Sequence, residues 1–170
     1  IEVFTRINTG GKVLTLFEIM SAKTYDEATE FDMQVGWEAF QSELNNISFE
    51  NISPTVALQL LSLKISETKE CKRKTILTLE KSDILANWEA GLSAIRSAID
   101  YFRTVLRIPV SQLLPYDTLL VPFAYFYMIT GKVPNGQQRK YLEELFWRSA
   151  LSQRYSSAAE SKLAADIKRV

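Results

Sequence analysis

Apolar residues recur at intervals of three and four along most of the chain, which is the period of an α-helix with one buried face. The clearest case lies between residues 84 and 106, where the pattern predicts the longest helix of the protein. Its apolar stripe consists of Ile84, Trp88, Leu92, Ile95, Ile99, Phe102 and Leu106. We expect Ser82 or Asp83 to cap this helix and Ile108-Pro109 to end it.

The other predicted helices have recognisable start signals. Two pairs of residues have the spacing of a capping box: Thr15 with Glu18, and Ser157 with Glu160. The segment 54–66 follows Ser53-Pro54 and is apolar nearly all round, so we expect it to be central. Further helices are expected near residues 35–44, 117–129 and 136–151, and the charged stretch 67–74 is expected to be a connection. The pattern predicts an all-α fold, an irregular bundle of about six or seven helices with at most one short strand.

The composition is that of a single folded domain. The chain has 170 residues, of which 46% are hydrophobic and 11% aromatic, and this is enough to bury a core. Its most apolar stretch, residues 113–129, is interrupted by Pro115, Asp117 and Pro122. We therefore expect a buried helix there and no membrane association.

The chain begins at Ile1 rather than at a methionine. We therefore expect a fragment of a larger protein, with residues 1–170 forming a single helical domain. Residues 1–14 would belong with a missing upstream module, and residues 15–170 would form the helical bundle.

The charge distribution and the residue types limit the kinds of catalytic, metal and disulfide chemistry that the chain can perform. The net charge is zero, but residues 1–60 contain 3 basic and 9 acidic side chains, whereas residues 131–170 contain 8 and 4. The chain has no histidine, so it lacks the commonest general base and metal ligand. Cys71 is the only cysteine, which excludes an internal disulfide and, without a signal peptide, favours a cytoplasmic location. We expect no metal site and no catalytic residue in this chain.

Four basic residues near Tyr155 could contact nucleic acid, because cations beside aromatic rings suit phosphates and bases. They are Arg139, Lys140, Arg148 and Arg154. The alternative, which we favour, is a solvated helix face whose cations are balanced by Glu143 and Glu144.

The segment 4–15, Phe-Thr-Arg-Ile-Asn-Thr-Gly-Gly-Lys-Val-Leu-Thr, is the most informative in the chain. Its two glycines let the backbone turn and approach a ligand closely, and Arg6 offers a planar fork for phosphate or carboxylate. A helix starting at Thr15 would present free N–H groups that favour anions. The alternative is a joint between two helices in which Asn8 and the glycines only cap.

This segment resembles the Phe-x-Arg-Ile-Asn-x-Gly-Gly-x-x-Leu motif of the family called domain of unknown function 262. The amino-terminal module of that family is a ParB/sulfiredoxin-like nucleotidase, as in GmrSD-type modification-dependent restriction enzymes. The matching residues are Phe4, Arg6, Ile7, Asn8, Gly10, Gly11 and Leu14. Weaker similarity to the helical portion of the family extends over Glu18-Ile19, Leu114-Pro115-Tyr116, Phe146-Trp147-Arg148 and Gln153-Arg154-Tyr155-Ser156.

The resemblance implies that the parent protein binds and hydrolyses a nucleoside triphosphate and belongs to the restriction or phage-defence class. One edge of the nucleotide site would be formed by Arg6, Asn8, Gly10 and Gly11. The rest would come from an Asp-Gly-Gln-Gln-Arg motif in the upstream nucleotidase module. Relatives often have a downstream nuclease domain, which makes DNA a candidate partner of the parent protein. The fragment alone is expected to be inactive and to hold no cofactor.

The sequence Asn-Gly-Gln-Gln-Arg at residues 135–139 looks similar to Asp-Gly-Gln-Gln-Arg, but it begins with Asn135 and lies downstream of the motif. We interpret it as a turn and a helix start. The rival hypothesis for the whole chain is a non-enzymatic helical scaffold or protein-interaction module that shares the fold without the activity.

Overall fold

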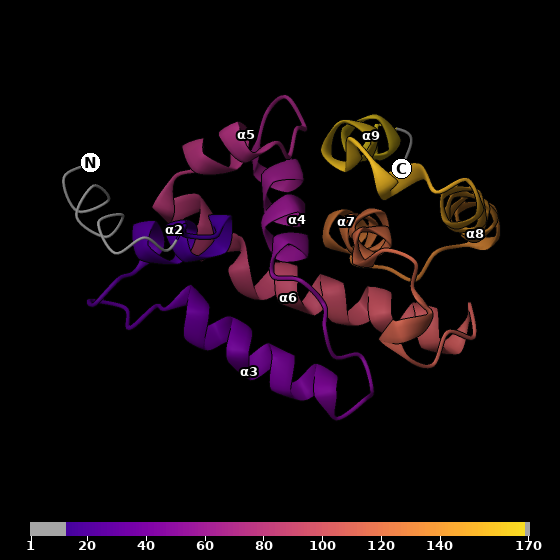
Figure 1. Cartoon of the computed structure of the whole chain (residues 1–170), viewed down its shortest axis with the longest axis horizontal. Helices are drawn as coiled ribbons and strands as arrows, with labels where there is room; N and C mark the ends of the chain where they lie inside the picture. The colour runs from indigo at the N-terminus through magenta and orange to yellow at the C-terminus, as the bar shows by residue number, and fades with distance from the viewer. Residues whose placement is uncertain (1–12, 169–170) are drawn as a thin grey trace.

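The computed structural model of the chain describes residues 13–168, and these residues form a helical bundle (Figure 1). The helices are α2 (Leu16–Thr24), α3 (Met33–Asn45), α4 (Thr55–Ile65), α5 (Arg73–Thr78), α6 (Lys81–Thr104), α7 (Leu120–Thr130), α8 (Gly136–Leu151) and α9 (Ala159–Ile167). Short 3-10 helices span Ser111–Leu113, Asp117–Leu119 and Arg154–Ser156. The only strand-like feature in the described part of the chain is an isolated antiparallel bridge between Asp26 and Phe31. The predicted all-α fold is confirmed.

The centre of the bundle is formed by α4, α6 and α7, which make the most extensive helix–helix contacts (Figure 1). Every side chain from Val56 to Leu63 of α4 is buried, which confirms that the helix predicted to be apolar all round is central. The predicted stripe of α6 is also buried. Gly91 of α6 lies against α4, since a Cβ there would lie 3.4 Å from Leu61 Cδ2.

Aromatic clusters join the outer helices to this centre. Phe102 of α6 meets Phe123 of α7 edge to face at 4.7 Å between ring centroids, and Phe146 of α8 at 5.1 Å. On the other side of the bundle, the rings of Phe17 in α2 and Trp37 in α3 lie 6.1 Å apart. These contacts fix α8 at one end and α2 with α3 at the other, as Figure 1 shows.

Two element boundaries differ from the prediction. Part of the stretch expected to be a connection forms α5, which is held to the core by the fully buried Ile76. The long helix begins at Lys81, so the expectation that Ser82 or Asp83 would cap it was wrong. Both residues lie inside the first turn, and no side chain caps this end.

The second predicted capping box was also wrong. Helix α9 follows Ala158, whose φ of 49° lies in the left-handed region, and no side chain caps it. Ser157 is one residue too early, because the left-handed Ala158 follows it and the helix begins only at Ala159. Lys162 Nζ of α9 donates to the carbonyl oxygen of Arg154 at 2.6 Å and so links α9 to the preceding 3-10 helix.

No helix in the described part of the chain is long and apolar enough to cross a membrane.

Candidate functional site

The four residues of the candidate nucleotide site, Arg6, Asn8, Gly10 and Gly11, lie outside the described residues. The structure instead shows the helix start to which this motif leads. The capping box there is confirmed: Thr15 Oγ1 accepts a hydrogen bond from Glu18 N at 3.2 Å, and Thr15 N donates to Glu18 Oε2 at 2.7 Å. The motif therefore joins the bundle at a well-capped helix.

The capping box changes the electrostatics expected at this helix start. A bare amino terminus of a helix attracts anions through its free N–H groups. Here the carboxylate of Glu18 already occupies that position. An anion at this helix start would have to compete with the Glu18 carboxylate.

Helix α2 is anchored firmly behind this start. Phe17 and Met20 are buried in the core. At the other end, Lys23 Nζ donates to the carbonyl oxygens of Leu77 at 2.9 Å and Leu79 at 2.6 Å, and so ties α2 to the end of α5. The segment that follows the motif is therefore held in one position relative to the bundle.

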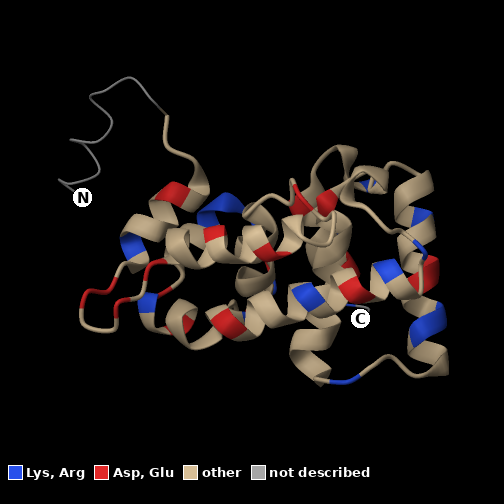
Figure 2. Ribbon diagram, turned by 90° about the horizontal axis from the view of Figure 1, so that it is seen from below, with Lys and Arg blue, Asp and Glu red and all other residues tan. Residues whose placement is uncertain are grey.

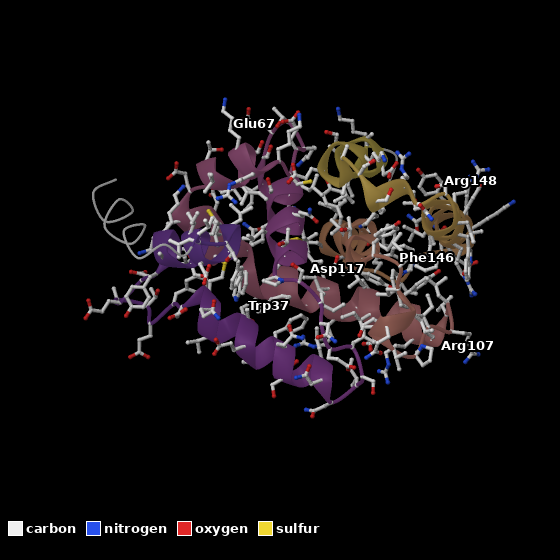
Figure 3. All side chains as sticks on the ribbon, viewed as in Figure 1. Trp37, Glu67, Arg107, Asp117, Phe146 and Arg148 are labelled. Carbon is white, nitrogen blue, oxygen red and sulfur yellow. The ribbon has the colours of Figure 1, made fainter. Side chains whose placement is uncertain are left out.

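The predicted nucleic-acid residues divide into two groups in the structure. Arg139, Lys140 and Arg148 are exposed on α8, and Figure 3 shows Arg148 pointing outward at the edge of the molecule. Arg139 Nε lies 2.7 Å from Glu143 Oε1, and Arg148 pairs with Glu144. The carboxylates thus balance two of the three cations, as the favoured alternative expected.

The fourth basic residue, Arg154, is turned toward the protein. Its Nε and Nη2 atoms donate to the two oxygens of Asp166, each at 2.7 Å, and Tyr155 Oη donates to the same carboxylate at 2.7 Å. Asp166 is only 2% exposed. The carboxylate raises the pKa of Arg154, and burial raises the pKa of Tyr155. This unit links the 3-10 helix Arg154–Ser156 to α9. Sequence reasoning missed it because the partners are twelve residues apart and lie in two different elements.

The segment that resembles Asp-Gly-Gln-Gln-Arg is a helix start, as interpreted from the sequence. Asn135 Oδ1 accepts from Gln138 N at 3.1 Å, and Gln138 Oε1 accepts from Asn135 N at 3.0 Å. These residues cap α8, and the amide groups serve its first turn.

The chain on either side of the Leu-Pro-Tyr sequence at residues 114–116 is hydrogen-bonded to the connection that precedes α4. Asp117 Oδ2 accepts from the backbone N–H of Ser53 at 2.9 Å, and Ser111 Oγ donates to the carbonyl oxygen of Glu50 at 2.5 Å. Figure 3 shows Asp117 beside the start of α4. A hollow of about 350 Å³ lies between these two connections. These hydrogen bonds fix the chain before α4 against the chain before α7.

Two further kinds of site can be judged from the described residues: a reactive cysteine and a metal site. Cys71 is fully buried, and burial with the nearby carboxylates raises the pKa of its thiol to about 12. The thiol is therefore protonated near neutral pH. No three Asp, Glu or Cys side chains between residues 13 and 168 converge in a way that could hold a metal ion.

Comparison of the chain with protein-family models, with curated proteins and with solved structures gives no match.

Proposed function

We propose that the chain is the helical portion of a nucleotide-hydrolysing protein of the modification-dependent restriction and phage-defence class. In this proposal Arg6, Asn8, Gly10 and Gly11 form one edge of the nucleotide site. An upstream module with an Asp-Gly-Gln-Gln-Arg motif supplies the rest of the site. DNA is then the substrate of the whole protein rather than a ligand of this bundle.

One observation carries the proposal: seven residues between positions 4 and 14 match the motif of domain of unknown function 262. The chemistry of the segment suits the role, because an arginine fork and a glycine turn can hold a phosphate group. The bundle supplies a fixed support for it, since α2 begins directly after the motif with both ends tied down.

The bundle also sets a distance between the motif and the end of the molecule at which α8 lies. Helix α2 lies at one end of the molecule and α8 at the other (Figure 1). Between them, α4, α6 and α7 form a continuous core. A bundle of this kind could hold an effector domain at a fixed distance from the nucleotide site.

The experiment is Arg6→Ala in the intact protein, with nucleotide binding measured by calorimetry and the free energy of unfolding measured in parallel. Loss of a charge-assisted hydrogen bond costs about 1.5–3 kcal/mol, so we expect binding to weaken roughly tenfold to a hundredfold. Arg96→Ala is the matched control, because Arg96 is a half-exposed arginine paired with Glu43 on the bundle surface. This control should bind nucleotide like the unaltered protein.

The rival function, a helical scaffold without nucleotide chemistry, predicts a different outcome. Arg6→Ala would then lower the stability and leave nucleotide binding unchanged, because Arg6 would act only at the joint before α2. An upstream region without Asp-Gly-Gln-Gln-Arg would point the same way.

A further inference from the structure

A groove of about 500 Å³ lies between α3, α6 and the loop that joins α2 to α3. Its apolar walls are formed by Phe31, Val35, Leu85 and Trp88. Its rim contains the carboxylates of Glu30, Asp32 and Glu89. The groove is therefore apolar inside and acidic at its edge.

Trp88 brings a polar group to this groove that lacks a partner. The side chain is only 2% exposed, and its ring packs edge to face on Phe31. Its Nε1 lies beside the gap left by Gly36, where an added Cβ would lie 2.9 Å away. Among the described residues none accepts a hydrogen bond from this N–H, and Trp88 and Gly36 both line the groove. The nitrogen is not among the buried side-chain atoms that lack a partner, so this N–H is accessible and can donate to an acceptor that enters the groove.

The charge around the groove is strongly negative. Residues 26–38 include five carboxylates and no lysine or arginine. Asp26 is paired with Lys81 at 3.1 Å, and Asp32 is committed to the cap of α3 through its Oδ1. Glu30 and Glu89 are exposed and have no cationic partner among the described residues. Figure 2 shows the acidic positions along this loop, with Lys and Arg positions at both ends of the molecule.

We propose that this groove binds a basic peptide segment of another protein. A lysine or arginine of the peptide lies between Glu30 and Glu89, and a backbone carbonyl oxygen accepts from Trp88 Nε1. A neighbouring apolar side chain covers Val35, which is 61% exposed. A peptide supplies the cation, the acceptor and the apolar contact together, whereas nucleic acid would be repelled by the carboxylates.

This site is separate from the proposed nucleotide site. The motif precedes the start of α2, and the groove adjoins the loop after its end. The nine residues of α2 set these two points about 13 Å apart. Either proposal can therefore fail without the other.

The test follows the indole N–H signals of the chain by heteronuclear NMR during titration with an amphipathic lysine–leucine peptide. The Trp88 signal, assigned by its loss in Trp88→Phe, should move downfield as its N–H gains an acceptor. The signal of Trp147, which lies on α8, should stay in place. A glutamate–leucine peptide of the same pattern should not bind.

The charge contribution is tested with Glu30→Gln and Glu89→Gln. Exposed ion pairs contribute about 0.2–1 kcal/mol, so each variant should weaken peptide binding by up to about fivefold. Glu67→Gln is the matched control, since Glu67 is an exposed carboxylate on the connection before α5, away from the groove (Figure 3). It should bind the peptide unchanged.

Three results would overturn the proposal. One is a Trp88 signal that stays in place while the lysine–leucine peptide is added to saturation. Another is equal weakening by Glu67→Gln and Glu89→Gln, which would indicate diffuse attraction. The third is movement of the Trp88 signal with protein concentration alone, which would make a second copy of the chain the occupant.

Discussion

Ile95 lies in the middle of α6, and its side chain is fully buried. Truncation to alanine removes three carbon atoms from a close-packed site and leaves a cavity. We expect Ile95→Ala to lower the free energy of unfolding by about 2–5 kcal/mol in urea denaturation. Leu151→Ala is the control, because Leu151 is 81% exposed and its loss should change the stability by less than about 0.5 kcal/mol. Equal effects of the two changes would mean that α6 is wrongly placed.

Cys71 should make the free energy of unfolding depend on pH in the alkaline range. Burial and the charges of Glu160 and Glu70 raise the pKa of its thiol from 9.0 to about 12 in the folded protein. Above pH 9.0 the unfolded chain releases this proton while the folded chain keeps it, so the free energy of unfolding should fall as the pH rises toward 12. Urea denaturation at several pH values checks this, and Cys71→Ala should flatten the decline just above pH 9.0. Tyr101, whose pKa burial and Glu143 also raise to about 12, adds to the decline above pH 10.0. An unchanged slope in Cys71→Ala would contradict the assignment.

At the scale of single helices, Thr15 before α2 and Ser157 before α9 offer a matched pair of mutations. Thr15 accepts a hydrogen bond at the start of α2, whereas Ser157, which has the same sequence spacing to a glutamate, caps nothing. Thr15→Ala should therefore cost about 1 kcal/mol of unfolding free energy, and Ser157→Ala only a few tenths. Hydrogen exchange should show faster opening of α2 in the first variant and an unchanged α9 in the second. A reversed order would contradict the two observed helix starts.

Sequence periodicity predicted the long helices well, because one strong apolar stripe outweighs local ambiguity over many turns. The same reasoning failed for α5, since six residues with two cations at their start give too little pattern to separate a helix from a charged loop. It also failed at Ser157. This residue is extended, as an N-cap should be, but the left-handed Ala158 follows it and cannot be the first residue of a helix.

The candidate sites show the same limit. The nucleotide motif could be proposed from the sequence because its residues are contiguous, and it stays a prediction. The pairing of Arg154 with Asp166 could not, since it depends on how the chain folds after α8. The groove at Trp88 was equally hidden, because the sequence places Trp88 in the core. Only the folded chain brings Gly36 to its N–H.

At the scale of the whole molecule, charged residues of both signs lie at both ends. The acidic loop before α3 lies at one end, and the exposed cations of α8 lie at the other (Figure 2). In the proposed arrangement the nucleotide is held by Arg6 and by the missing module, close to the capped start of α2. The end at which α8 lies then faces the effector domain and its DNA. This arrangement predicts that nucleotide contacts are confined to the end of the bundle at which α2 begins, where Arg6 would have to supply the positive charge.

Photoaffinity labelling of the intact protein with azido-ATP or azido-GTP tests this claim most directly. Trypsin cuts after Arg6 and Lys12, so Asn8, Gly10 and Gly11 of the motif are released on a peptide of residues 7–12. We expect the label on this peptide, and we expect an excess of unmodified nucleotide to abolish it. Label found only on peptides of α8, or only outside residues 1–24, would contradict the account.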